Sequence, residues 1–280
     1  MLRDGGTEEV RRSFAQAADP RARLILDSLT RHLHAFVKEV RPSREEWAAA
    51  IDFLTRTGQR CDDTRQEFIL LSDVLGVSML VEELNAGDAG TESTVVGPFH
   101  VGDSPVRELG ASIDLLGVGE PCVVTGRVVD LDGTPLRGAT VDIWQWSADG
   151  YYDVQQPDRQ PQGNGRGLFT ADAEGRFWFR TVVPSHYPIP TDGPAGELLR
   201  AAGRHPYRPA HIHVIAAADG HDPVTTHAFV ADSPYLDSDA VFAVRESLIR
   251  PFDVIDEAER AAAFGVTHPF RLLQLELVLG

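Results

Sequence analysis

Cysteine, basic charge and long apolar runs are all scarce in this sequence of 280 residues. Cys61 and Cys122 stand far apart, which argues against a disulfide framework and a cysteine-based zinc site. Lysine and arginine total 26 against 42 aspartates and glutamates, a net charge of −16, so the basic face needed for nucleic acid is missing. No stretch approaches the roughly 18 apolar residues of a membrane span. Since the N-terminus also lacks a signal-peptide core, we expect a cytoplasmic protein without a membrane or nucleic-acid partner.

The first part of the chain has the apolar spacing of helices. From about residue 8 to 85, apolar side chains recur every three or four positions. Ser43 followed by Glu46 fits a capping box at a helix start. Gly76 interrupts the striped segment 67–84, which is therefore expected to be one helix or two short ones.

Beyond about residue 120 the pattern changes to short strands separated by Gly, Pro and Asp turns. Such a series is typical of a β-sandwich rather than of alternating βαβ units. We also expect one late helix over 237–249. The sequence thus predicts an α+β fold, with a helical region over 1–103 followed by a mainly antiparallel β-sandwich over 104–280. The expected strands include 123–129, 140–146, 176–183, 211–215 and 272–279.

The most informative local pattern is His211-Ile212-His213 in a predicted strand. Side chains alternate along a strand, so both imidazoles point to one face and can reach one metal ion. His32-Leu33-His34 has the same spacing in a predicted helix, where positions i and i+2 diverge by roughly 200°. That second pair is not expected to bind metal. A single such motif in a strand also fits ordinary packing, so both interpretations stay open.

Two tyrosines lie where predicted strands run into loops, Tyr152 in DGYYDVQ and Tyr187 in VPSHYPIP. A phenolate is a hard anionic donor and suits Fe(III) better than Zn(II) or Cu(I). Two phenolates would leave Fe(III) with one net positive charge. On composition alone, aromatic residues at the rim of a fold beside prolines are the simpler interpretation, and the choice stays open here.

Three longer segments resemble the intradiol ring-cleavage dioxygenases, in order and at similar spacing. The resemblance extends to ESTVVGPF at 92–99 and YLDSDAVFAVRESLI at 235–249. Within the family it is closest to the hydroxyquinol 1,2-dioxygenases, which carry the strings YPIP, DGP and PYRPAHIH. The three segments are GATVDIWQWSADGYYDVQ, RTVVPSHYPIPTDGP and HPYRPAHIHV.

The resemblance implies one non-haem Fe(III) per subunit, held by two tyrosines and two histidines. Tyr152 and His213 match the equatorial ligands, and Tyr187 and His211 match the axial pair. It also implies that the substrate displaces Tyr187, which then takes up a substrate proton.

Two further residues gain catalytic roles from the resemblance. Arg208 would face negative charge developing on the substrate ring, whereas a surface ion pair is the alternative for an arginine in an acidic protein. His227 stands where catechol-cleaving relatives have glutamine, so we expect it to form hydrogen bonds near the iron.

The walls of a substrate pocket also follow from the resemblance. Asp73 and Leu70 lie three residues apart, so one helix face offers a carboxylate beside an apolar contact. A carboxylate there would accept a hydrogen bond from a third ring hydroxyl and repel a ring carboxylate; the alternative is a solvated helix residue. Val96 is smaller than expected in its motif, which leaves the tolerance for ring substituents open. The other predicted wall residues are Val95, Gly97, Pro98, Phe99, Ile189, Pro190, Arg208 and Val241.

The resemblance therefore implies ring opening of a catechol-type substrate by O2, with residues 104–280 as the catalytic domain. Hydroxyquinol (1,2,4-trihydroxybenzene) would give 3-hydroxy-cis,cis-muconate, a tautomer of maleylacetate. Catechol or a substituted catechol is the alternative substrate. A non-enzymatic β-sandwich binding module would also fit GRVVDLDGTPLRGATVDIW, but it would need neither the histidines nor the tyrosines. A homodimer through the helices of 1–103 is implied too, in some family members with an amphiphile between protomers.

Overall fold

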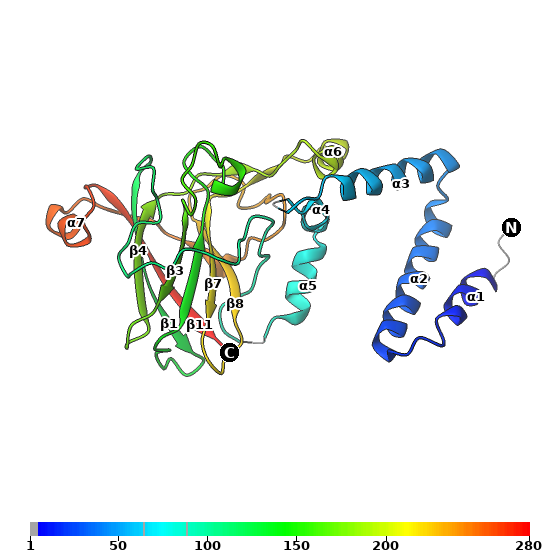
Figure 1. Ribbon diagram of the computed structural model, residues 1–280, viewed down its shortest axis with the longest axis horizontal. Helices are drawn as coiled ribbons and strands as arrows, with labels where there is room; N and C mark the ends of the chain where they lie inside the picture. The colour runs from blue at the N-terminus through cyan, green and yellow to red at the C-terminus, as the bar shows by residue number, and fades with distance from the viewer. Residues whose placement is uncertain (1–4, 64, 88) are drawn as a thin grey trace. The chain divides into compact units, whose positions relative to one another are not determined.

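The computed structural model describes residues 5–63, 65–87 and 89–280 (Figure 1). The chain divides into two compact units, of which the first ends at Thr55 and the second begins at Arg56. The first contains α1 (Gly5–Ser13), α2 (Pro20–Val40) and most of α3 (Arg44–Gln59). Within the described ranges, no helix is both long and apolar enough to cross a bilayer. The assignment of dimerisation to residues 1–103 and of catalysis to residues 104–280 remains a prediction.

Local sequence sets the helix starts in the first unit. The side chain of Asp19 accepts the backbone N–H of Arg21 at 2.9 Å, and Pro20 occupies the first helical turn of α2. At the start of α3, the Ser43 N–H donates to Glu46 Oε2 at 2.7 Å and the Glu46 N–H donates to Ser43 Oγ at 3.1 Å. The predicted capping box is therefore confirmed.

The described residues of the second unit add four α-helices and two short 3-10 helices. Gly76 separates α4 from α5 with a φ of +72°, a left-handed conformation that glycine adopts without steric cost. The segment 67–84 is therefore two short helices rather than one. The helices are α4 (Glu67–Val74), α5 (Val77–Asn85), η1 (Asp153–Gln155), α6 (Pro194–Ala201), η2 (Glu246–Leu248) and α7 (Ala258–Phe264).

Two sheets pack into a sandwich in the body of this unit (Figure 1). One has the order β10-β11-β1-β4 and the other β3-β2-β7-β8-β9, while β5 and β6 form a separate two-stranded ribbon. The pairs β1–β11 and β8–β9 are parallel and the other pairs are antiparallel, so the predicted α+β sandwich is confirmed with mixed sheets. The strands are β1 (Pro121–Asp130), β2 (Thr140–Trp144), β3 (Arg166–Thr170), β4 (Arg176–Val182), β5 (Tyr187–Pro188), β6 (Tyr207–Arg208), β7 (His211–Ala217), β8 (Val224–Val230), β9 (Ile249–Arg250), β10 (Asp253–Ile255) and β11 (Phe270–Leu279).

The core lies between the inner faces of the two sheets. Val124 and Phe179 from the first sheet share one buried apolar cluster with Ile143 and Ile212 from the second. Each such burial contributes roughly 1.5–3 kcal/mol of hydrophobic free energy. Because side chains alternate along β7, burying Ile212 in the sandwich turns its neighbours on both sides to the outer face of the five-stranded sheet.

The predicted late helix over 237–249 is wrong. The segment is a series of turns followed by η2 and β9. The carboxylate of Asp239 accepts the backbone N–H groups of Val241 at 3.3 Å and Ala243 at 3.0 Å, and Phe242 has a φ of +61°. Captured amide donors and a left-handed residue cannot continue a right-handed helix.

Candidate metal centre

Four residues in register form a row across the five-stranded sheet. Arg166 of β3 pairs with Trp144 of β2, Trp144 with His213 of β7, and His213 with His227 of β8. Directly opposed residues on neighbouring strands project to the same face, so these side chains gather on the outer face. The Trp144 indole stacks on the His213 ring with centroids 4.6 Å apart and planes 11° apart, which fixes the orientation of that imidazole.

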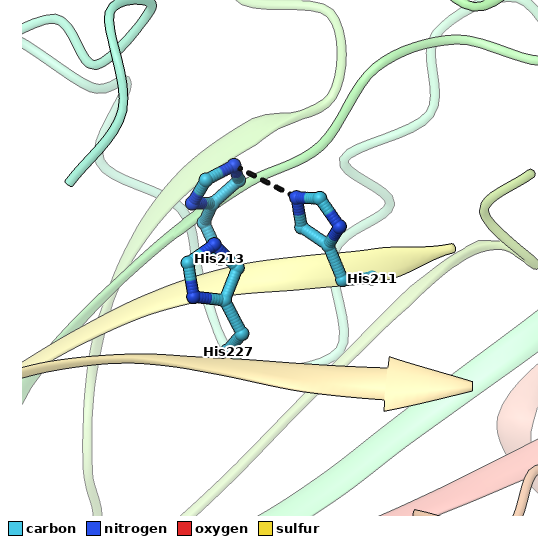
Figure 2. Close-up of side chains that lie close together, drawn as sticks. All are labelled: His211, His213 and His227. Atoms are coloured by element: carbon cyan, nitrogen blue, oxygen red, sulfur yellow. Dashed lines mark hydrogen bonds between the residues drawn. The ribbon is translucent and has the colours of Figure 1, made fainter. Parts of the chain in front are cut away.

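His211 and His213 face each other across one residue of β7, as the strand pattern predicts. Their Nε2 atoms are 3.1 Å apart, and Figure 2 shows both rings with that of His227 on the same side of the two strands. The Nδ1 of His211 lies 2.8 Å from the carbonyl oxygen of Pro209. A carbonyl only accepts, so Nδ1 carries the proton and the Nε2 lone pair is directed at the cluster.

Burial keeps the three clustered histidines uncharged. It lowers the pKa of His211, His213 and His227 well below the usual value, and nearby positive charge, chiefly that of Arg208 at His211 and His227, lowers it further. Among the residues that the structure describes, the Nδ1 of His213 and the Nε2 of His227 are buried without a hydrogen-bond partner. Neutral imidazoles with free nitrogens are the form of histidine that binds metal ions.

Both predicted tyrosine ligands reach this cluster. Tyr152 lies in the loop after β2 with its hydroxyl 3.0 Å from His213 Nε2. Tyr187 is placed by the β5–β6 ribbon, where it pairs directly with Arg208, and its ring centroid is 5.9 Å from that of His211. The two phenol rings are 6.1 Å apart and nearly perpendicular. The structure thus brings together all four side chains singled out in the sequence.

The arrangement fits a metal ion. Two donors bound at about 2.05 Å and a right angle to one another are roughly 2.9 Å apart, close to the separations between Tyr152 Oη, His213 Nε2 and His211 Nε2. Burial raises the pKa of both phenols, and the proximity of Tyr187 raises that of Tyr152 further. A bound cation would offset that cost by stabilising the phenolates.

Arg208 lies beside the candidate ligands and is 2% exposed. Its Nη1 is 3.2 Å from His211 Nε2, and its Nε donates to Asp239 Oδ1 at 3.1 Å. The alternative of a surface ion pair is therefore wrong, because the pair is buried. The sequence did not indicate a role for Asp239, because the apolar spacing around it predicted a helix.

His227 is held by a second residue that the sequence analysis missed. Thr94, fully buried, forms a hydrogen bond through its hydroxyl with His227 Nδ1. Its backbone N–H donates to the carbonyl of Thr225 at 2.8 Å. With Nδ1 occupied, Nε2 is the free nitrogen of a ring whose centroid lies 4.6 Å from that of His211 and 4.2 Å from that of His213. The only sequence signal was its place in the ESTVVGPF segment.

Asp73 is buried within range of the charges of Arg208 and Asp239. It is 2% exposed, and its Oδ1 has no hydrogen-bond partner among the described residues. Burial raises its pKa, an effect that the charge of Arg208 opposes and that of Asp239 reinforces. The alternative of a solvated helix residue is thus wrong, and a carboxylate oxygen is available inside the protein.

Three other predicted wall residues lie close to the candidate ligands or to Asp239. The Phe99 ring centroid is 5.0 Å from that of Tyr152. A Cβ on Gly97, where φ is +78°, would lie 3.5 Å from His213 Cε1. The backbone N–H of Val241, which is buried, donates to Asp239.

A cavity of about 710 Å³ is lined in part by Phe99, Ile189 and Pro190, three of the predicted wall residues. Leu70 and Val95 are buried and Pro98 is partly buried, whereas Val96 is 37% exposed. The place of these last four in the substrate pocket remains a prediction.

A buried carboxylate connects the helix that carries Asp73 to α6. Glu67 is 0% exposed; its Oε1 accepts the Ala195 N–H at 3.0 Å, and its Oε2 accepts Arg65 Nη2 at 2.7 Å. A Cβ on Gly193 would lie 2.4 Å from Glu67 Oε1, so a larger residue at this position of the DGP string would displace the Glu67 carboxylate. The sequence did not indicate this role for Glu67, because a glutamate at the start of a predicted helix is usually exposed to solvent.

Comparison with known proteins finds relatives over nearly the whole chain. The family described as dioxygenase matches residues 97–274, and the catechol dioxygenase N terminus matches residues 19–92. A hydroxyquinol 1,2-dioxygenase of Rhizobium sp. is 50% identical over 270 residues, 96% of this chain and 92% of the relative. A 6-chlorohydroxyquinol 1,2-dioxygenase of Cupriavidus pinatubonensis is 52% identical over 245 residues, 87% of this chain and 88% of the relative.

Solved structures of two dioxygenases are also similar to this chain. The hydroxyquinol 1,2-dioxygenase of Pseudomonas putida DLL-E4 superposes with a TM-score of 0.88 and 46% identity, covering 98% of this chain and 96% of that one. The catechol 1,2-dioxygenase of an Acinetobacter species gives a TM-score of 0.85 and 29% identity, covering 98% and 91% of the two chains.

Proposed function

The chain belongs to the intradiol ring-cleavage dioxygenases, an iron-dependent family, and we propose that its substrate is hydroxyquinol. Opening of the ring by O2 would give 3-hydroxy-cis,cis-muconate, a tautomer of maleylacetate. Membership over residues 97–274 removes the non-enzymatic binding module from consideration. The observation that carries the choice of substrate is the buried carboxylate of Asp73, whose Oδ1 has no hydrogen-bond partner in the described part of the chain and whose pKa burial raises and the charge of Arg208 lowers.

We propose that one Fe(III) per subunit is held by Tyr152, Tyr187, His211 and His213. Two phenolates and two neutral imidazoles form a hard, partly anionic donor set, which suits ferric iron. When bound, ferric iron supplies the Lewis acidity and one-electron chemistry that make an aromatic diolate reactive toward O2.

Tyr187 is the residue that we propose to receive a proton from the substrate. Burial raises its pKa, so its phenolate has a high proton affinity, while Arg208 acts against that rise. The two effects oppose each other, which favours a side chain that can be either a phenol or a phenolate during turnover. Arg208, held by Asp239, would also stabilise negative charge on the substrate ring. His227, held by Thr94, would present Nε2 as a hydrogen-bonding group beside the reacting atoms.

Asp73 supports recognition of a third ring hydroxyl. A buried carboxylate oxygen without a partner gains a hydrogen bond when a hydroxyl reaches it. A substrate without that hydroxyl leaves the oxygen unpaired, and a substrate carboxylate would be repelled. Hydroxyquinol would therefore be preferred over catechol and over protocatechuate.

Catechol or a substituted catechol is the second candidate substrate. Val96 is smaller than its motif predicts, which favours a pocket with room for a ring substituent. The relative that acts on 6-chlorohydroxyquinol is 52% identical to this chain, which also supports tolerance of a substituted ring.

We further propose a homodimer formed through the N-terminal helices. Large apolar side chains of α2, among them Leu29, Leu33 and Phe36, are more than half exposed in the single chain. Continuous exposed apolar surface of this kind is typical of an interaction site, and an amphiphile between the protomers would cover it in the same way. Light scattering of the purified protein measures the subunit number, and a monomer at micromolar concentration would overturn this proposal.

Colour and oxygen uptake test the proposed activity. Purified protein with stoichiometric iron should be red to burgundy because of charge transfer from phenolate to Fe(III), and Tyr187→Phe should alter that colour. Oxygen-uptake rates should rank hydroxyquinol above catechol, 4-chlorocatechol and protocatechuate. A colourless protein with full iron would overturn the ligand assignment, whereas catechol far outpacing hydroxyquinol would overturn both the proposed substrate and the role given to Asp73.

A further inference from the structure

Arg166 is a buried cation behind Tyr152, on the same row as His213. It is 1% exposed, and its Cζ lies 5.8 Å from the centroid of the Tyr152 ring. Trp144, its partner in the sheet, is the residue that stacks on His213. A charge placed there acts on two of the proposed iron ligands.

One carboxylate fixes this guanidinium and leaves its far end unpaired. Arg166 Nε donates to Asp153 Oδ1 at 2.7 Å, while Asp153 Oδ2 accepts the Gly163 N–H at 2.8 Å. Both Nη atoms are buried and have no hydrogen-bond partner among the described residues. An unpaired buried guanidinium nitrogen costs free energy, so its retention beside an aromatic face points to a role for the charge.

The glycine-rich turn at 163–167 builds this placement. Gly165 has a φ of +73°, and a Cβ there would lie 2.3 Å from the carbonyl oxygen of Gln145. The turn therefore packs directly on the chain that leaves β2, and Arg166 enters β3 opposite Trp144. The conformation of this turn thus delivers Arg166 to the sheet beside Trp144.

We propose that Arg166 is a positioning residue for the metal centre, whose charge, held by Asp153, orients the Tyr152 ring and stabilises its oxygen as an anionic donor. The inference rests on the proposed role of Tyr152 as an iron ligand. The Arg166 guanidinium lies over the phenol ring of Tyr152, whose oxygen is directed toward His213. A cation held at this range lowers the energy of a phenolate electron pair by Coulomb attraction.

The test is the energy of the phenolate-to-iron charge-transfer band in the iron-loaded protein. Arg166→Gln keeps a donor toward Asp153 but removes the cation, so the band should shift to longer wavelength. Asp153→Asn removes the opposing anion and keeps the cation, so the shift should be to shorter wavelength. Arg166→Lys keeps the charge and should restore the wild-type position. Resonance Raman spectra assign the shifted component to one of the two tyrosines.

Arg107→Gln is the matched structural control. Arg107 supports the same turn by donating to the carbonyl oxygens of Arg166 at 2.7 Å and Gly163 at 3.0 Å, so its loss loosens the turn while the cation behind Tyr152 remains. The control should lower the melting temperature and leave the band in place.

Shifts of opposite sign in Arg166→Gln and Asp153→Asn would support the inference. Shifts of the same sign, unmoved bands, or an equal shift in Arg107→Gln would overturn it. A purely structural role would not make the direction of the band shift depend on the sign of the charge that is removed. If Arg166→Gln does not fold, the direction in Asp153→Asn decides. A wild-type protein that is colourless with full iron would instead overturn the proposed ligand set, and this inference with it.

Discussion

Asp239 accepts the Nε–H of Arg208 at 3.1 Å inside the protein, and its other carboxylate oxygen accepts the backbone N–H of Ala243 at 3.0 Å. The pair connects the turns after β8 to β6, the strand whose Arg208 lies opposite Tyr187. A single carboxylate therefore fixes both the loop and the arginine that we propose to act on the substrate.

Asp239→Ala should destabilise the protein and nearly abolish turnover. Removing one partner of a buried ion pair leaves an uncompensated charge, which costs about 3–5 kcal/mol in the free energy of unfolding. Asp237→Ala is the matched control, because Asp237 is exposed on the same loop and surface changes stay within about 0.5 kcal/mol. Urea denaturation and oxygen uptake measure both effects. Equal behaviour of the two variants would show that the buried pair has no special role.

Asp73→Leu should weaken the preference for hydroxyquinol. The ratio of kcat/KM for hydroxyquinol to that for catechol should fall about 5- to 150-fold, since the lost hydrogen bond is worth about 1–3 kcal/mol. Burial raises the pKa of Asp73, so its ionised form is disfavoured in the folded protein. The variant should therefore be at least as stable as wild type at neutral pH. Ser72→Ala, on the same helix, should leave the ratio unchanged, and an unchanged ratio in Asp73→Leu would refute the assignment.

Thr94→Val should lower kcat through His227. Valine keeps the shape of threonine but leaves His227 Nδ1 buried and unpaired, which costs about 1–3 kcal/mol and frees the ring to turn. Thr226→Val removes a neighbouring buried hydroxyl that donates to the carbonyl of Glu92 at 2.8 Å, so its stability cost should be similar. Steady-state kinetics should then show a loss of kcat only in Thr94→Val; a matching loss in both variants would indicate a structural role alone.

Glu67→Gln should raise KM more than it lowers kcat. The change weakens the charge-assisted bonds from Arg65 and costs about 1.5–3 kcal/mol in stability, and it loosens the helix that carries Asp73. Glu197→Gln is the control, because the Arg56–Glu197 pair is exposed and such pairs contribute about 0–1 kcal/mol. Kinetics on hydroxyquinol at several concentrations separate the two parameters. A fall in kcat at constant KM would contradict the expected loss of binding.

The metal-free protein should lose stability as the pH falls below about 6.5. The unfolded histidines take up protons there, whereas burial keeps the pKa of His211, His213 and His227 well below the usual value in the folded state. Three extra protons bound by the unfolded state correspond to a loss of up to about 4 kcal/mol per pH unit. Melting temperatures measured from pH 7.5 to 5 would show the slope, and a flat profile would mean that these rings are protonated when folded.

Much of the local structure was accessible from the sequence, because its causes are local. The Ser43–Glu46 capping box depends on residues three apart, and the break at Gly76 on one backbone conformation. The facing pair His211 and His213 follows from alternation along a single strand. The failure at 237–249 has the opposite cause, since Asp239 is held by Arg208 from a distant strand and overrides the helical spacing.

Tertiary structure determined which distant residues lie close together at the site. Tyr187 reaches the histidines because β5 pairs with β6, and Tyr152 because its loop closes over β7. The sequence suggested these two tyrosines through family resemblance and through the preference of Fe(III) for phenolate donors. Long-range pairing and burial carry no local signature, and they alone placed Thr94 on His227 and Arg166 behind Tyr152. The sequence by itself therefore determined which side chains share a strand face, whereas sheet register and loop closure decided which distant groups support them, because those contacts join residues that no local periodicity relates.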